Sequence, residues 1–318
     1  MTTWLIALLV ILAACALFWL AWPAPLARLF MAAERRRGGL RTRRFEHDGI
    51  EWHLLEGGHG EPLVLLHGFN GDAYHFARVS RALGKHFRVI APDLPGFGQT
   101  RFDSELEFDV ESQARRVLDL LDELGIDRFY LGGSSMGGYV ACALARLAPG
   151  RVRALWLLDP GGLQTAALSP LFEIVDQGGH NALVVRDRSD FVRLMDYCFV
   201  RPPWLPGPLA RELADRAGRN ASRAQAIFDD IRFRSTPLEQ LAEGLAVPAL
   251  IVWGQADQVL HPEGLDILAE RMPSARKLLL PDTGHLPMIE RPRTVAESWI
   301  SFAESLARAD DSPPNRQV

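Results

Sequence analysis

The stretch Leu131–Gly138, which reads LGGSSMGG, joins a predicted strand to a predicted helix and decides the fold. Within it, Gly133-x-Ser135-x-Gly137 matches the nucleophile elbow, a strained turn that raises one serine hydroxyl above a sheet. A Cβ at either flanking glycine would collide with the neighbouring helix and strand. The amides at the start of the helix point at the same place, which favours developing negative charge there. The stretch therefore predicts Ser135 as a nucleophile.

Strand-like and helix-like segments alternate on both sides of this turn. Apolar, β-branched runs predict strands at Pro62–Leu66, Phe87–Ala91, Phe129–Gly132, Ala154–Leu158, Ala249–Trp253 and Lys277–Leu280. Helical periodicity predicts helices at Ala73–Leu83, Val110–Leu124, Met136–Leu147, Pro262–Arg271 and Arg291–Leu306. An antiparallel hairpin is expected from Arg44–His47 and Glu51–Glu56 around Asp48-Gly49. This alternation indicates an α/β fold with a mostly parallel sheet and helices on both faces.

One long interval interrupts the alternation. About ninety residues separate the strands ending at Leu158 and beginning at Ala249, too many for a simple crossover. Helical patterns within the interval occur at Phe191–Phe199, Leu209–Arg219 and Arg223–Arg232. We therefore expect one catalytic domain over 45–308, with a helical cap at about 162–246 inserted before the penultimate strand, and a disordered tail at 309–318.

The first residues of the chain read as a membrane anchor. Trp4–Trp22 carries no charge, and as a helix it would reach roughly 28 Å, close to a hydrocarbon core of about 30 Å. Pro23 and Pro25 are expected to end that helix. A cleaved signal peptide is the alternative, but no Lys or Arg precedes Trp4. The prediction is an uncleaved transmembrane helix within residues 1–25.

A basic segment follows the anchor. Residues 1–44 hold seven arginines against the single acidic residue Glu34, and all seven lie between Arg28 and Arg44. The positive-inside rule then predicts a single-pass protein with its catalytic domain on the cytoplasmic side, at the inner membrane if the source is bacterial. Residues 26–44 are expected to be a juxtamembrane linker, either attracted to anionic lipid or simply solvated.

Composition excludes several other classes of protein. The 318 residues carry 35 Lys and Arg against 39 Asp and Glu, and this net charge of −4 gives no reason to expect a nucleic-acid partner. Three scattered cysteines are too few for a disulfide scaffold or a four-ligand zinc site. G-x-G-x-x-G, P-loop and H-E-x-x-H patterns are missing from the sequence, so no cofactor and no metal are expected. The sequence gives no indication of an oligomeric state.

Two further residues complete a candidate catalytic set with Ser135. A serine needs a base that a third group holds in place. Asp257 and His285 each follow a predicted strand, and the chain order Ser135, Asp257, His285 is typical of one class of serine hydrolase. Asp159 also follows a strand and stays open as an alternative partner for His285.

Hydrolysis also requires donors for a developing oxyanion. The backbone N–H of Met136, directly after the nucleophile, is the first candidate, and that of Phe69, after an earlier strand, is the second. Their side chains are expected to line an acyl pocket. The neighbouring His67 is interpreted either as functional or as a brace for this loop.

With these motifs in place, the chain resembles α/β-hydrolases of the membrane-anchored monoacylglycerol lipase type over about residues 45–306. The resemblance is carried by His67-Gly68-Phe69, Asp93–Gly98 (DLPGFG), Ser134–Gly138 (SSMGG), Trp253–Leu260 (WGQADQVL), and Gly284-His285 with Glu290-Arg291-Pro292. It implies a cofactor-free serine hydrolase cleaving monoacylglycerols or related lipid esters. By the family motif, Ser135 would be the nucleophile, His285 the base and Asp257 its orienting partner, with Phe69 and Met136 as oxyanion donors.

Two alternatives remain beside this hypothesis. A carbon–carbon bond hydrolase acting on a ring-cleavage product would use the same three residues but would gain nothing from an anchor. A membrane-tethered binding protein with an inactive hydrolase fold would need none of the three. The apolar cap stretch Tyr197–Pro206 is interpreted either as ordinary packing or as a lipid contact.

Overall fold

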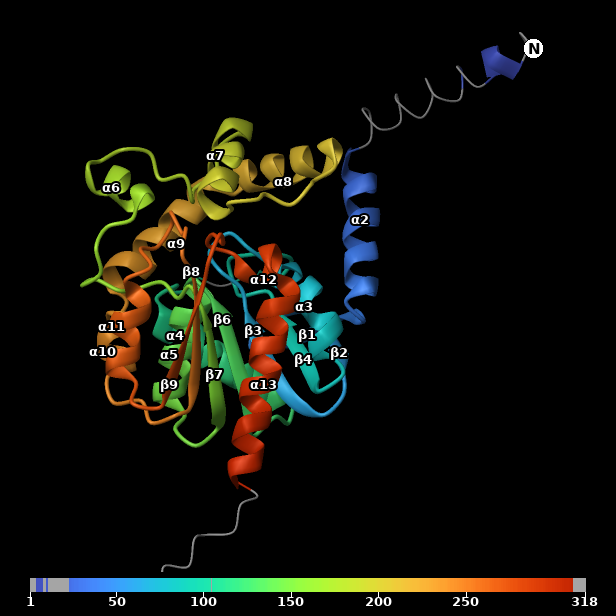
Figure 1. The fold of residues 1–318 in the computed structure, drawn as a ribbon. Helices are drawn as coiled ribbons and strands as arrows, with labels where there is room; N and C mark the ends of the chain where they lie inside the picture. Colours follow the sequence, from blue (N-terminus) through green and yellow to red (C-terminus); the bar gives the residue numbers. More distant parts are fainter. Residues whose placement is uncertain (1–3, 8–9, 11–22, 104, 311–318) are drawn as a thin grey trace, which may run out of the picture.

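The computed structural model describes residues 4–7, 10, 23–103 and 105–310, of which 309 and 310 are described by their backbone alone. Its centre is a nine-stranded sheet in the order β1-β2-β4-β3-β6-β7-β8-β9, with β5 beside β2 (Figure 1). The strands are β1 (Leu40–His47), β2 (Ile50–Gly58), β3 (Glu61–Leu66), β4 (Phe87–Pro92), β5 (Arg101–Phe102), β6 (Phe129–Ser134), β7 (Val152–Leu158), β8 (Ala249–Gly254) and β9 (Ala275–Leu280). The neighbouring strands in the run β4-β3-β6-β7-β8-β9 pair in parallel. Strand β2 pairs antiparallel with β1, β4 and β5. The predicted mostly parallel sheet is confirmed.

The predicted hairpin is also confirmed. His47 of β1 pairs with Ile50 of β2, which leaves Asp48 and Gly49 as a two-residue turn. Both turn residues have positive φ, 49° and 71°, as the tightest right-twisted hairpins require. The short strand β5, which the sequence did not predict, pairs antiparallel with the start of β2, on the side that β4 occupies farther along.

Alternate residues along each strand enter two separate cores, because side chains of a strand point to opposite faces. On β3, Leu63 and Leu65 face one core and Val64 and Leu66 the other. The first core is covered by α3 (Ala77–Leu83) and α13 (Pro292–Asp310). The second is covered by α4 (Val110–Glu123), α5 (Met136–Leu147) and α11 (Gly264–Arg271) (Figure 1). The prediction of helices on both faces is therefore confirmed.

One predicted helix is divided in the structure, and another is preceded by a short helix that was not predicted. The segment predicted at Ala73–Leu83 begins as a 3-10 turn, η1 (Ala73–Phe76), in which the Asp72 side chain accepts from the N–H of Tyr74. The segment predicted at Arg291–Leu306 is preceded by a separate short helix, α12 (Pro287–Glu290). The break falls at Arg291, with φ −127° and ψ 50°, since a residue before proline avoids the helical conformation.

Four helices between β7 and β8 lie above the carboxyl ends of the strands and form the predicted cap (Figure 1). They are α6 (Pro170–Asp176), α7 (Arg188–Cys198), α8 (Gly207–Arg219) and α9 (Ala221–Arg234). The sequence missed α6, although Ser169 caps it and Pro170 opens it, a typical start signal. A fifth helix, α10 (Leu238–Ala242), packs against α5 and α11 in the sheet core, so the cap ends before α10 rather than at residue 246.

The predicted linker over 26–44 is wrong for most of its length. Residues Pro23–Arg37 form helix α2, and β1 begins at Leu40. Pro23 and Pro25, which were expected to end a helix, are the first and third residues of α2 as the structure describes it. Helix α2 packs against α3, β1 and the cap helix α8, which joins it to the folded domain (Figure 1).

The two predicted ends of the chain fall mostly outside the described residues. Within the described residues, no helix has both the length and the apolar character that a membrane crossing needs. Most of Trp4–Trp22 lies outside them. At the other end, α13 continues to Asp310, two residues beyond the predicted domain boundary, and 311–318 lie outside the description.

Candidate active site

Ser135 occupies the tight turn between β6 and α5. Its backbone has φ 53° and ψ −121°, a conformation that L-residues rarely adopt. The turn is held from both sides, since Ser135 N donates to Leu158 O at 2.9 Å and Ser135 O accepts from Gly161 N at 3.0 Å. The surroundings thus hold the serine in a strained position at the carboxyl end of the central strand.

The two flanking glycines permit this turn for the predicted reason. A Cβ at Gly133 would lie 2.2 Å from Gly137 O in α5, and one at Gly137 would lie 2.0 Å from Leu66 O at the end of β3. Backbone atoms at such distances cannot yield without moving a strand or a helix. The elbow therefore requires glycine at both positions.

His285 and Asp257 form a buried hydrogen-bonded pair. His285 Nδ1 lies 2.8 Å from Asp257 Oδ2, and each residue is 4% exposed. Asp257 Oδ1 accepts from the backbone N–H groups of Val259 and Leu260, at 2.7 and 3.0 Å. With an acceptor on Nδ1, the imidazole carries its proton there and presents Nε2 as a base.

The cap fixes the backbone of the same histidine. His285 N donates to Cys198 O, at the end of α7, at 2.8 Å. A Cβ on the preceding Gly284 would lie 2.4 Å from that same oxygen, so the two segments are in close backbone contact. One end of a cap helix is thus part of the support for His285.

Ser135 and His285 line one cavity of about 540 Å³. The hydroxyl of Ser135 makes no hydrogen bond with His285 or any other residue that the structure describes. In unliganded hydrolases this bond is often long and tightens only with substrate. The three residues predicted from sequence are therefore brought to one place, with Ser135 positioned apart from the bonded pair.

Both predicted oxyanion donors border Ser135. Met136 is the first residue of α5, so its N–H has no acceptor within the helix. In the described part of the chain the N–H of Phe69 also donates to no other group. A Cβ on Gly68 would lie 3.1 Å from Ser135 Cβ, which places the Phe69 loop against the elbow.

His67 acts as the brace of this loop. It is fully buried, and its Nε2 accepts from Leu94 N at 2.9 Å while Nδ1 lies 2.8 Å from Gly68 O. Its ring also meets Phe97 edge-on at 5.8 Å. The alternative of a bracing role, left open from the sequence, is the one the geometry supports.

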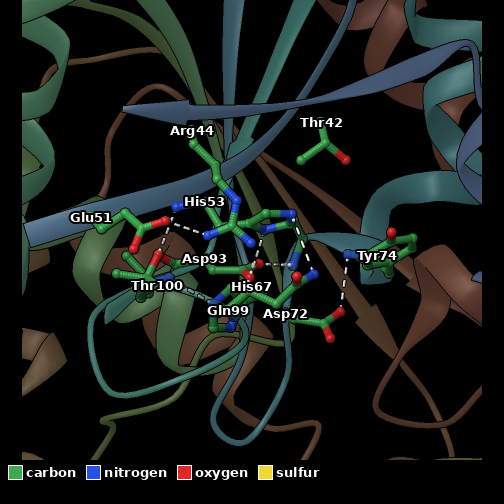
Figure 2. A network of polar contacts seen from close by, with 12 residues as sticks. Thr42, Arg44, Glu51, His53, His67, Asp72, Tyr74, Asp93, Gln99 and Thr100 are labelled. Atoms are coloured by element: carbon green, nitrogen blue, oxygen red, sulfur yellow. Dashed lines mark hydrogen bonds and ion pairs between the residues drawn. The ribbon is translucent and has the colours of Figure 1, made fainter. Parts of the chain in front are cut away.

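A second buried pair, missed by the sequence analysis, extends the brace. Figure 2 shows His53, Asp93, Gln99 and Thr100 converging beside His67. His53 Nδ1 lies 2.8 Å from Asp93 Oδ2, which also accepts from Gln99 N at 2.7 Å. Asp93 Oδ1 accepts at 2.8 Å from the N–H of residue 73, at the start of η1. The Asp93–Gly98 motif thus ties the Phe69 loop to β2, and a histidine on an interior strand was the available sequence signal.

Asp159, the alternative partner of His285, lies behind Asp257. It is fully buried, and its Oδ1 accepts from Gly254 N at 2.8 Å. Burial and then the charge of Asp257 raise the pKa of Asp159 well above its ordinary value. The imidazole Nδ1 lies against Asp257 and not against Asp159.

The donor atoms of Asp159, Asp257 and His285 all lie within 4.8 Å of one another, and hydrogen bonds already account for the position of Asp257 in this cluster. Asp257 is already engaged by two backbone N–H groups and by the imidazole. Cys142 and Cys198 are buried and free, and Cys15 lies outside the described residues.

A second cavity, of about 390 Å³, is also lined by Ser135. Met136, Tyr139 and Trp253 line it, whereas His285 lines only the larger one. Both cavities share Ser135 and the side chain of Phe69. Two cavities with different lining residues therefore both border Ser135.

The larger cavity is rich in arginine. Arginines line it at positions Arg44, Arg78, Arg101, Arg216 and Arg223, and acidic residues at Glu34 and Asp72. The cap residue Arg216 pairs with Asp72 at 3.0 Å, a contact that the sequence did not predict. Arg101 and Arg223 are exposed and form no ion pair with a described residue.

Comparison with known proteins agrees with this architecture. The model of the alpha/beta hydrolase family matches residues 63–298. "Lipase 1" of Psychrobacter immobilis is 32% identical over 251 residues, which cover 78% of this chain and 78% of that protein. "Monoacylglycerol lipase ABHD6" of Homo sapiens is 28% identical over 309 residues, covering 92% and 91%.

Among solved structures, that of a membrane phospholipase A, described as a bacterial virulence factor, is similar with a TM-score of 0.87 at 35% identity. The match covers 96% of this chain and 99% of that one. The chain therefore belongs to the alpha/beta hydrolase family, as a lipase-like hydrolase.

Proposed function

We propose that the protein is a serine carboxylic-ester hydrolase that cleaves monoacylglycerol-like lipid esters through an acyl-enzyme. The observation that carries the proposal is the 2.8 Å bond from His285 Nδ1 to the buried Asp257, in a cavity that Ser135 also lines. This arrangement leaves Nε2 free as a base beside a strained serine. Lipase relatives support the lipid ester as substrate.

In the proposed reaction, Ser135 Oγ attacks the ester carbonyl and its proton passes to His285 Nε2. The oxyanion accepts hydrogen bonds from the N–H groups of Phe69 and Met136. When the C–O bond breaks, His285 gives the proton to the leaving alcohol. Water then attacks the acyl-enzyme by the same route and releases the acid, while Asp257 stabilises the imidazolium in both halves.

The two cavities suggest where each part of the substrate binds. The leaving alcohol must lie within hydrogen-bonding reach of His285, which lines only the larger cavity. The smaller cavity begins at Met136 and continues past Tyr139 and Trp253, which suits an acyl chain. We assign the head group to the larger cavity and the acyl group to the smaller one.

A phosphate-bearing head group is a second candidate, on one specific observation. The larger cavity has five arginines against two acidic residues, although the chain as a whole has a net charge of −4. Arg101 and Arg223, which form no ion pair with a described residue, are suited to a phosphate oxygen. The phospholipase relative supports this candidate.

We further propose that the protein works at a membrane, as a single-pass protein with its catalytic domain on the cytoplasmic side. The apolar Trp4–Trp22 and the seven arginines that follow it support this placement. The arginine-lined cavity reaches Phe30 and Met31 of α2, directly after that segment. A lipid leaving the bilayer beside α2 would meet this cavity first.

The first experiment tests the nucleophile. A fluorophosphonate probe should label the wild-type protein and should not label Ser135→Ala. Ser134→Ala is the matched control, because Ser134 is the neighbouring serine with a fully buried hydroxyl. Equal labelling of the wild type and Ser135→Ala would overturn the assignment.

The second experiment tests the substrate class. Monoacylglycerols, lysophospholipids, p-nitrophenyl esters and a ring-cleavage diketone acid are hydrolysed in parallel by the wild type and by Arg101→Glu/Arg223→Glu. The monoacylglycerol proposal predicts lipid esters as preferred substrates, and the phosphate candidate predicts that the double variant loses about tenfold or more on lysophospholipids alone. Cleavage of the diketone acid alone would support the carbon–carbon hydrolase, and no turnover at all would support a binding protein.

A further inference from the structure

Asp159 is a buried carboxyl group that the proposed reaction does not use. It follows β7 directly, its N–H donates to Val252 O of β8 at 3.0 Å, and its backbone has φ 44°. Its Oδ1 accepts from Gly254 N. Its Oδ2 is buried and has no hydrogen-bond partner among the described residues. An unpaired carboxylate oxygen in such a place would be costly, whereas a protonated one needs only an acceptor.

That acceptor is close at hand. Asp159 and Asp257 each contribute an oxygen to a cluster whose atoms all lie within 4.8 Å of one another. Two buried carboxyl groups at this separation do not both ionise, because their charges repel in a medium of low dielectric constant. One of the two must hold a proton.

The hydrogen bonds decide which of them holds it. Asp257 receives two backbone N–H groups and the Nδ1–H of His285, three donors that stabilise a carboxylate. Asp159 receives one donor, Gly254 N. The negative charge therefore resides on Asp257 and the proton on Asp159.

We propose that Asp159 is a neutral carboxylic acid whose Oδ2–H donates a hydrogen bond to Asp257, which makes it a positioning residue for the Asp257–His285 pair. The inference rests on the proposed serine-hydrolase function. It assigns two effects to the bond. Asp257 is held in the orientation that bonds Nδ1, and part of its charge is shared, which limits how strongly it favours the imidazolium form of His285.

The electrostatics of the pocket agree with this assignment. Burial first, and then the charge of Asp257, raise the pKa of Asp159 well above its ordinary value, which is the direction expected for the member of the pair that holds the proton. The other titratable groups around the pair are Glu290, which accepts from Gly284 N at 2.9 Å, the Cys198 thiol, whose pKa burial raises, and His75, whose pKa burial lowers to about 4. None of these changes in the variants below.

Two substitutions at Asp159 separate the roles. Asp159→Asn keeps a neutral side chain that accepts from Gly254 and donates to Asp257. Asp159→Leu keeps the branched shape with a somewhat larger volume, and removes both the donor to Asp257 and the acceptor of Gly254 N. The readout is kcat/KM for a p-nitrophenyl ester as a function of pH, together with thermal unfolding of each variant.

The neutral-donor role predicts that Asp159→Asn stays within about threefold of the wild type, with the acidic limb of its pH profile unmoved. Asp159→Leu should lose about tenfold or more, and its acidic limb should move up by about 0.5–1 pH unit, because an unshared Asp257 charge stabilises the imidazolium. A downward shift in Asp159→Asn would overturn the proposal, since it would reveal an ionised Asp159. An unmoved profile in Asp159→Leu with lower thermal stability would reduce the residue to a structural role.

A spectroscopic measurement keeps the inference testable apart from activity. Infrared spectroscopy of the wild type at neutral pH should show the carbonyl band of a protonated carboxyl group, which Asp159→Asn removes. Persistence of the band in that variant would contradict the assignment. If Ser135→Ala instead retained labelling, the proposed function would fail while this band still tested the protonation of Asp159.

Discussion

Gly137→Ala offers a sharp test of the elbow geometry. The added Cβ would lie 2.0 Å from Leu66 O, 2.5 Å from Leu66 C and 2.6 Å from His67 O. All three atoms belong to the backbone that leads from β3 into the Phe69 loop. Rotation of a side chain cannot relieve the contact, so α5 and that loop must separate.

The size of the separation follows from the distances. Lengthening the contact with Leu66 O from 2.0 Å to 3.4 Å, where ordinary van der Waals contact begins, requires a movement of about 1.4 Å. Ser135 and Met136 stand on one side of this contact and Phe69 on the other. Misplacement of reacting groups by about 1 Å costs on the order of 10²-fold in rate. Overpacking of this kind costs about 2–3 kcal/mol of unfolding free energy, or roughly 3–5 °C in Tm for a domain of this size.

The assay is hydrolysis of a p-nitrophenyl ester, with the melting temperature measured in parallel. We expect kcat/KM to fall by about 10²-fold or more. Gly207→Ala is the matched control, because a Cβ there meets nothing within 4 Å and the change should leave both quantities unaltered. Wild-type kcat/KM in Gly137→Ala would show that the elbow and the Phe69 loop do not need this spacing, and would refute the reasoning.

Two further predictions concern the base and its surroundings. Asp257→Asn should lower kcat by about 10³-fold. The backbone N–H groups on Oδ1 keep the amide oxygen in place, so the amide NH₂ faces His285 Nδ1 and the imidazole takes the wrong tautomer. A loss below tenfold would point to Asp159 as a replacement acid. His75 has its pKa lowered by burial to about 4 from 6.5, so the unfolded chain takes up the proton first, and stability present above pH 6.5 is lost as the pH falls toward about 4. His75→Asn should flatten the fall of Tm across that window, and an unchanged slope would contradict the burial of this imidazole.

The parts of the fold that local patterns dictate could be predicted from the sequence. The elbow could be recognised because close contacts with the adjoining strand and helix require glycine at both flanking positions. The hairpin at Asp48 and Gly49 was readable because positive φ at two successive residues restricts the choice of side chains. The order of Ser135 and the two later residues was readable because each follows an apolar strand.

Other features depend on contacts between distant segments and left no local signal. Helix α2 was predicted as a linker because its arginines suggest solvent, while its packing on α8 is visible only in three dimensions. The His53–Asp93 pair joins residues forty positions apart. The relation of Asp159 to Asp257 depends on the register of β7 with β8, which periodicity does not fix.

The hydrogen bond from His285 N to Cys198 O means that the end of cap helix α7 holds the backbone of the proposed base in position. The cap is one insertion between β7 and β8, so it can be exchanged as a unit. In this chain such an exchange must conserve the end of α7, because a replacement that shifts Cys198 also shifts the imidazole. Grafts that change residues 170–187 and 200–234 while retaining 188–199 should therefore alter substrate choice without loss of the base. Substrate specificity can therefore change in the rest of the cap, while the end of α7 must stay as it is for His285 to keep its position.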